Sequence, residues 1–218
     1  MGSITRGLSN NITTGGVILP AGITNSSVSA VTSFANASGG TLTLLSTQTA
    51  SASATISFTT GLDSTYDEYI FKFINIHPAT DGAEFQFNMS TDSGSNYNVT
   101  KTTTFFMAYH DEADTDTSLI YQTTRDLAQS TDFQRLNIQI ENDADSNLSG
   151  SLTLFNPSST TYVKHFLSNT NMMHTTPYSM NAFVAGYGNT TSAINAIQFK
   201  MTSGNLDGVF KLYGVKKS

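Results

Sequence analysis

Short runs of alternating hydrophobic and polar residues follow one another along most of the chain after residue 41. In EFQFNMS, residues 84–90, a hydrophobic side chain stands at every second position, which is the period of a strand with one buried face. YIFKFINI, residues 69–76, is apolar except for Lys72 and Asn75, so it predicts a central strand that is buried on both faces. No segment shows the period of a full-length helix, and the pattern therefore predicts an all-β protein.

Polar turns separate these runs at short intervals, which indicates about ten to twelve strands with short connections. This organisation is typical of an antiparallel β-sandwich, and we predict a jelly-roll-like one. Because a jelly roll often places its first and last strands side by side, we expect residues 42–48 to pair with residues 209–215. We also expect two hairpins, 150–157 with 162–169 and 193–201 with 208–215, and a short helical turn at 125–132.

The first 40 residues differ from the rest, since they carry one charged residue, Arg6, and many small polar ones. Such a segment buries too little apolar surface to offset its ordering entropy, so we predict an extended N-terminal arm (1–40) before a β-sandwich module (41–218). One alternative is a short turn or strand at 26–34 within a trimeric stalk, and another is a tail without a role. The residues that we expect to bind a partner are the apolar ones: Val17, Ile18, Leu19, Val28, Val31 and Phe34.

The composition narrows the possible partners. Only 12% of the 218 residues are charged, against roughly 25% in an ordinary soluble domain. The net charge is −6 and the basic residues are scattered, so we expect no nucleic-acid partner. There is no Cys for disulfides, and we find neither a signal-peptide pattern nor an apolar run long enough to cross a membrane. We therefore expect no membrane partner.

One stretch, ENDADSNLSG at residues 141–150, has the oxygen ligands of a calcium loop at alternating positions: Asp143, Asp145 and Asn147. The next position of such a loop needs Gly, but Leu148 stands there, and strands rather than helices are predicted on both sides. We therefore interpret the stretch as a hairpin turn between FQRLNIQI and SLTLFNP, with these three residues as the metal candidates.

A second acidic stretch, HDEADTDT, brings together Asp111, Glu112, Asp114 and Asp116. Carboxylates packed so closely repel one another, and a solvated loop relieves that repulsion as well as a cation would. We predict a solvated loop.

Catalytic signatures are missing from the sequence. It contains no nucleophile elbow, no zinc-protease motif and no Gly-rich phosphate loop, and its four histidines lie in different segments. Glu84 and Glu141 stand at strand ends, but nothing in the sequence brings them together as a glycosidase pair. We predict that the protein is not an enzyme and has no cofactor.

Binding of a glycan is a further hypothesis, because aromatic rings beside amide side chains are typical of sugar sites on β-sandwiches. The aromatic candidates lie in or beside polar loops, although they also suit the ends of core strands: Tyr97, Tyr109, Tyr121, Tyr178 and Tyr187.

Several stretches of the sequence resemble a known group of proteins. TLLSTQTASASATISFTTGLDSTYDEYIFKFINI, LTLFNPSSTTYVKHF and FVAGYGNTTSAINAIQFKM resemble small virion structural proteins of marine tailed bacteriophages, including cyanophages and pelagiphages. The resemblance implies a virion protein that is assembled in the host cytoplasm, as a capsid decoration or accessory protein or as a tail or head fibre that contacts host glycans. The implied partners are the major capsid protein or other virion proteins. We also expect a homo-oligomer, a trimer if the module binds around capsid threefold positions.

Overall fold

A computed structural model describes residues 12–13, 16–17 and 42–215 of the chain. The chain divides into two compact units, residues 1–39 and 40–218. In the first unit the described residues form a minimal antiparallel hairpin of β1 (Ile12–Thr13) and β2 (Gly16–Val17). Of the predicted partner-binding residues, Val17 lies in β2, and the other five lie outside the described residues.

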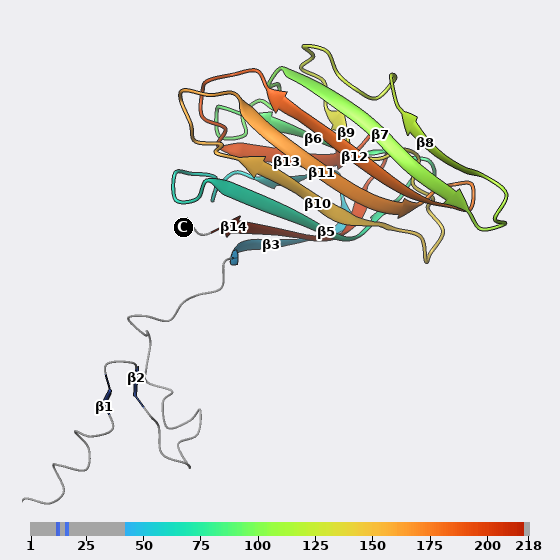
Figure 1. The fold of residues 1–218 in the computed structure, drawn as a ribbon, viewed down its shortest axis with the longest axis horizontal. Helices are drawn as coiled ribbons and strands as arrows, with labels where there is room; N and C mark the ends of the chain where they lie inside the picture. Colours follow the sequence, from blue (N-terminus) through green and yellow to red (C-terminus); the bar gives the residue numbers. More distant parts are fainter. Residues whose placement is uncertain (1–11, 14–15, 18–41, 216–218) are drawn as a thin grey trace, which may run out of the picture. The chain divides into compact units, whose positions relative to one another are not determined.

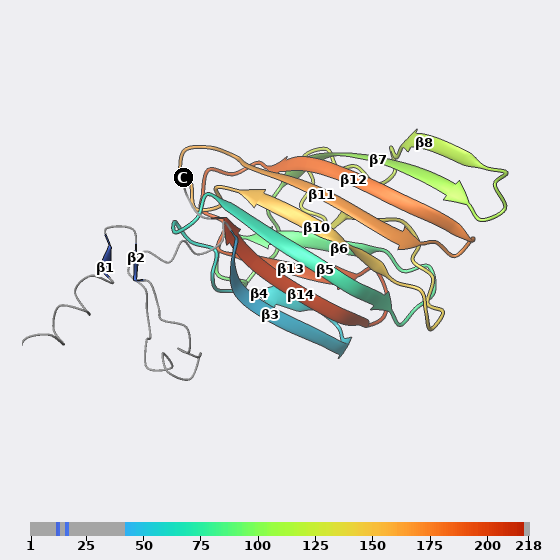
Figure 2. The same cartoon turned by 60° about the horizontal axis from the view of Figure 1, so that its bottom comes forward.

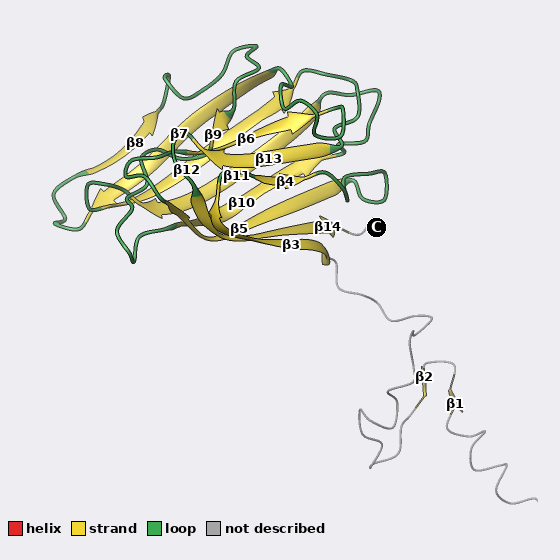
Figure 3. Cartoon of the chain, turned by 180° about the vertical axis from the view of Figure 1, so that it is seen from behind, coloured by secondary structure: helices red, strands yellow, loops and turns green. Residues whose placement is uncertain are grey.

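The second unit is a sandwich of two antiparallel sheets, which confirms the predicted all-β fold (Figures 1 and 3). The large sheet contains, in spatial order, β3 (Leu42–Ser53), β14 (Leu206–Val215), β5 (Glu68–Pro78), β10 (Leu148–Phe155), β11 (Lys164–Met173), β12 (Tyr178–Gly188), β7 (Lys101–Asp111) and β8 (Thr117–Tyr121). The small sheet contains β4 (Ile56–Phe58), β13 (Ala196–Met201), β6 (Phe85–Ser90) and β9 (Gln134–Arg135). The described part of the chain holds no helix that could cross a membrane.

The strand order is that of a jelly roll with two insertions. When β7, β8, β11 and β12 are set aside, the order is β3-β14-β5-β10 in one sheet and β4-β13-β6-β9 in the other. Numbered along the chain, these strands come first, eighth, third and sixth, then second, seventh, fourth and fifth, as in a double Greek key. The expected pairing of the first and last strands is confirmed, because Leu42 to Ser53 of β3 lie beside β14.

The four inserted strands continue the large sheet beyond β10, in the order β11-β12-β7-β8, and we call them the extension (Figure 2). They enter the chain at two places, between β6 and β9 and between β10 and β13. The predicted hairpin 150–157 with 162–169 is confirmed as β10 with β11, which joins the extension to the jelly roll.

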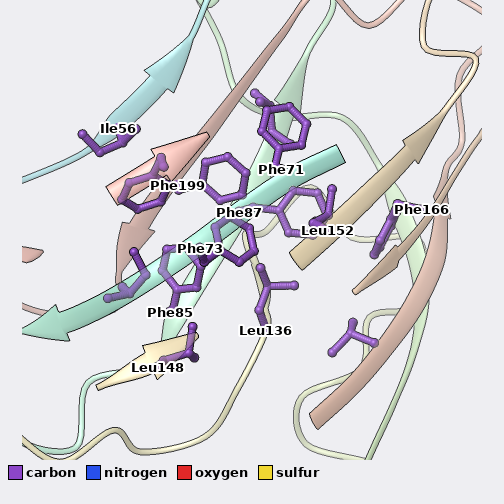
Figure 4. Packing of buried hydrophobic residues seen from close by; sticks show 14 of the residues in the cluster. Ile56, Phe71, Phe73, Phe85, Phe87, Leu136, Leu148, Leu152, Phe166 and Phe199 are labelled. Atoms are coloured by element: carbon purple, nitrogen blue, oxygen red, sulfur yellow. The ribbon is translucent and has the colours of Figure 1, made fainter. Parts of the chain in front are cut away.

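Aromatic rings from both sheets fill the core (Figure 4). Phe73 of β5 meets Phe85 of β6 edge to face at 5.0 Å, and Phe87 of β6 meets Phe166 of β11 at 4.9 Å. These rings are almost wholly buried, and each contributes roughly 1.5–3 kcal/mol by leaving water. The second contact ties the extension to the small sheet.

Three local predictions are wrong. The strand at 69–76 is central but buried on one face only, since Ile74 is exposed. Strands β13 and β14 are consecutive but lie in different sheets, so they do not form the predicted hairpin. Residues 125–132 form no helical turn, and Ser130 among them bridges instead to Lys101. In the first two cases the pattern gave the strand, and the packing of the sheets decided its neighbours.

Candidate functional site

The outer face of the extension carries no Asp, Glu, Lys or Arg side chain. Its four strands contain only three Asp, Glu, Lys or Arg residues, namely Lys101, Lys164 and Asp111, and all three are buried. The outward positions are instead occupied by Thr, Ser, Asn, Ala, hydrophobic residues and two histidines, His110 and His165. A monomeric protein that must stay soluble normally places charges on an open sheet face and on its edge strand. The composition of this face therefore favours a contact surface.

Exposed hydrophobic side chains gather at the centre of this face. Phe183 of β12 and Phe106 of β7 are cross-strand partners whose rings stack at 5.0 Å with 10° between their planes. Tyr121 continues the row on β8, and Leu119 beside it is 72% exposed. Leu167 of β11 is 55% exposed and, with the two phenylalanines, lines a shallow hollow of about 380 Å³. Rings held by strand pairing lose little entropy when a partner covers them.

Amide side chains border the hydrophobic centre. Asn169 Nδ2 donates to Asn181 Oδ1 at 2.9 Å, and Asn171 Nδ2 donates to the Met180 carbonyl at 3.2 Å. Each amide keeps hydrogen-bonding capacity toward solvent, because asparagine has two donors and two acceptor lone pairs. The face can therefore make apolar contacts and directional, uncharged hydrogen bonds.

The five candidate tyrosines do not form one cluster. Tyr109 and Tyr178 pack together at 5.1 Å and both donate to the carboxylate of Asp116. Desolvation and the charge of Asp116 raise the pKa of Tyr178, which keeps its hydroxyl a donor. Tyr121 belongs to the outer face described above, while Tyr187 packs beside His165 and Tyr97 lies in the loop after β6.

The acidic loop after β7 is organised by one of its own carboxylates. Asp111 accepts hydrogen bonds from the Thr115 hydroxyl and from the backbone N–H groups of Thr115 and Asp116. These bonds lower the pKa of Asp111. Glu112, Asp114 and Asp116 are exposed, whereas Asp111 is buried. The described residues contain no group of three or more His, Asp or Glu side chains that could hold a metal ion.

The stretch 141–150 is not a hairpin, and that prediction is wrong. The stretch connects the two sheets. It follows Ile140, which bridges to Ala83 just before β6 of the small sheet, and it runs into β10 of the large sheet. Asp143 and Asp145 are exposed, and the Asp143 carbonyl closes a tight turn with the Ser146 N–H at 2.9 Å. Asn147 is half-buried and its carbonyl accepts the Met173 N–H.

A buried carboxylate beside two arginines was missed by sequence reasoning. Glu84 Oε1 accepts from Arg125 at 2.7 Å and its Oε2 accepts from Arg135 at 2.8 Å. Glu84 is 6% exposed, and the arginines line a polar hollow beside it. Glu141 has a different partner, since its carboxylate accepts a hydrogen bond from the Ser146 hydroxyl at 3.0 Å. Arg125 lies in a loop and Arg135 in the two-residue strand β9. Hydrophobic patterns do not predict where such short segments lie in the fold.

Two buried lysines were also missed, although a signal for them exists. Lys101 lies in phase with Thr103, Phe105 and Met107, which face inward along β7. Lys101 and Lys164 are both fully buried, and both are cross-strand partners of Gly188. Their contacts are described below, because they lead to a separate inference.

Fold and surface together define an all-β sandwich protein with a jelly-roll core, an extended large sheet and an uncharged, partly hydrophobic outer face. Comparison with protein-family models, with curated proteins and with solved structures finds no match to this chain.

Proposed function

We propose that the chain is a bacteriophage virion structural protein, a capsid decoration or accessory protein that is assembled in the host cytoplasm. The observation that carries the proposal is the outer face of the extension, which has no Asp, Glu, Lys or Arg side chain and exposes Phe106, Phe183 and Leu167. Such a face suits a permanent contact with another virion protein, since hydrophobic side chains in the middle of an interface supply most of its stability. The sequence resemblance to phage virion proteins supports the same class.

In this proposal the N-terminal arm, residues 1–40, is the anchor, and the extension is a second contact with the capsid protein or with neighbouring copies. The low charge of the arm and of the outer face fits protein partners, rather than nucleic acid or a membrane surface.

Deletion of residues 2–38 tests the anchor. We expect the truncated protein to fold, with an unchanged circular-dichroism spectrum, and to be absent from purified virions. Normal incorporation of the truncated protein into virions would refute the anchoring role.

Substitution Phe183→Lys tests the outer face independently, because it places a charge at the centre of the hydrophobic cluster. We expect full-length protein with this change to fold but to be incorporated at a reduced level. Thr60→Lys adds the same charge at an exposed position outside the extension and serves as the matched control. Equal incorporation of both variants would exclude the outer face as a virion contact.

A receptor-binding fibre protein is the second candidate, and the amides Asn169, Asn171 and Asn181 beside the stacked rings favour it. Aromatic faces with neighbouring amides recognise sugars by stacking and hydrogen bonding. A glycan array with the wild-type protein and with Phe183→Lys separates the two functions. Saturable, sugar-competed binding that the substitution removes supports the fibre function, and many copies on the head, seen by electron microscopy, support decoration.

A further inference from the structure

Lys101 lies in the interior with an unusual set of partners. Its side chain is fully buried, and Nζ donates to Oδ1 of Asn88 at 2.6 Å and to the carbonyl of Val99 at 2.7 Å. No carboxylate of the described residues forms a salt bridge with it. Burial lowers its pKa to about 7, while the charge of Asp132 acts in the opposite direction. A substantial share of Lys101 is therefore a neutral, nucleophilic amine at neutral pH.

The carboxamide of Asn88 is also fully buried and held at every polar atom. Its Oδ1 accepts the backbone N–H of Met89 at 2.8 Å as well as the lysine. Its Nδ2 donates to the carbonyls of Tyr97, at 2.7 Å, and Thr131, at 2.9 Å. The amide cannot rotate away from the amine, and the Met89 N–H is placed to stabilise negative charge on Oδ1.

We propose that Lys101 and Asn88 join in an intramolecular amide bond, with release of ammonia. The neutral amine attacks Cγ of Asn88, and the Met89 N–H stabilises the oxyanion that forms on Oδ1. The proton from Nζ passes to Nδ2, the Cγ–Nδ2 bond breaks, and Nδ2 leaves as ammonia. A primary amide and an amine become a secondary amide and ammonia, so no oxidant or other reactant is needed.

Two features of the site favour this reaction. Fixed contact between the reacting groups can supply an effective molarity on the order of 10⁵–10⁸ M, which offsets the slowness of amide exchange between free molecules. Burial also excludes the water that would compete with the amine. The bond would link β6 of the small sheet to β7 of the extension. It would give a chain without cysteine a covalent brace between its layers.

Mass spectrometry of the purified full-length protein is the direct test. We expect an intact mass about 17 Da below that of the unmodified chain, the mass of ammonia lost when an amine nucleophile displaces it. Trypsin does not cleave after an acylated lysine. Denaturation and digestion should therefore give one peptide, residues 73–125, in place of 73–101 and 102–125.

Lys164 is the internal control, because it is equally buried and equally placed opposite Gly188 but contacts only the carbonyls of Tyr162 and Thr190. Cleavage after Lys164 should be normal. Asn88→Asp should lose water instead, about 18 Da, since a carboxyl group is then the acylating partner, and Asn88→Ala should lose neither.

An unmodified mass for the folded wild-type protein, with complete cleavage after Lys101 even after prolonged incubation at mildly alkaline pH, would overturn the proposal. The pair would then be a hydrogen bond and no more. A loss of about 17 Da that persists in Asn88→Ala would equally overturn it, because the ammonia would come from another residue.

Discussion

At the scale of single residues, the interior of this protein depends on a few polar groups that are fully paired. No buried side-chain nitrogen or oxygen of the described residues lacks a hydrogen-bond partner. Glu84 is the clearest case, since its carboxylate, directly before β6, pairs with Arg125 and with Arg135 of β9. Removal of the Glu84 carboxylate would leave the two guanidinium groups without their partner, which costs free energy.

We predict that Glu84→Gln lowers the free energy of unfolding by about 2–4 kcal/mol, because both guanidinium groups lose their counter-charge in a partly buried site. The lower part of this range is expected, since Arg135 is 40% exposed and solvent compensates it. Urea denaturation measures the effect. Glu112→Gln, at an exposed position of the acidic loop, is the control and should change stability little; equal effects of the two variants would contradict the prediction.

Because of His174, we expect the stability of the protein to depend on pH. It is 8% exposed, its Nδ1 accepts the Thr176 N–H, and burial lowers its pKa. The unfolded chain therefore binds this proton more readily than the folded chain, so stability is full above the unfolded pKa of about 6.5 and is lost as pH falls through the folded pKa.

In urea titrations from about pH 7 to about pH 5, the midpoint should fall for the wild type and fall less for His174→Gln. His165→Gln changes an exposed histidine and should keep the wild-type dependence. The acidic groups with a lowered pKa, such as Asp111, lose their stabilising effect at lower pH than this. They therefore do not obscure the effect of His174 between about pH 7 and about pH 5. If the urea midpoint of His174→Gln falls with pH as steeply as that of the wild type, groups other than His174 cause the pH dependence.

At the scale of the elements, the extension depends on close approach of its strands. Gly186 of β12 lies opposite Thr103 of β7, where a Cβ atom would come within 2.6 Å of the Thr102 carbonyl oxygen. The reason for glycine here is space between backbones, because an added methyl group would have to push the two strands apart.

We therefore predict that Gly186→Ala destabilises the protein by about 1–3 kcal/mol, the usual cost of overpacking. Hydrogen exchange should locate the effect in β7 and β12. Ala185→Ser, at the neighbouring outward position, is the control and should leave exchange unchanged. Faster exchange confined to the jelly-roll strands β3 and β14 would contradict the assignment.

At the scale of the whole molecule, the sandwich has its own complete core. The hydrophobic cluster takes residues from both sheets and from the extension, all between Ala50 and Leu212. We predict that residues 40–218 alone fold cooperatively, with a melting temperature close to that of the full chain. A broad, uncooperative thermal transition of residues 40–218 in calorimetry would show that the first unit is needed for folding.

Sequence and structure agree best where one strand can be judged alone. The alternation in EFQFNMS and the turn after SLTLFNP predicted β6 and the β10–β11 hairpin, because strand period and turn chemistry are local properties. The same reasoning failed at the stretch 141–150, where turn residues connect two sheets rather than two neighbouring strands.

By itself, the sequence determined the all-β class, the jelly-roll-like architecture and the pairing of the first and last strands. Only the tertiary structure decided that four inserted strands extend the large sheet, that Phe106 stacks on Phe183, and that Lys101 meets Asn88. The physical reason is that each of these features depends on cross-strand or inter-sheet neighbours. Hydrophobic periodicity specifies which face of a strand is buried, but the strands beside it are chosen by the packing of the whole core.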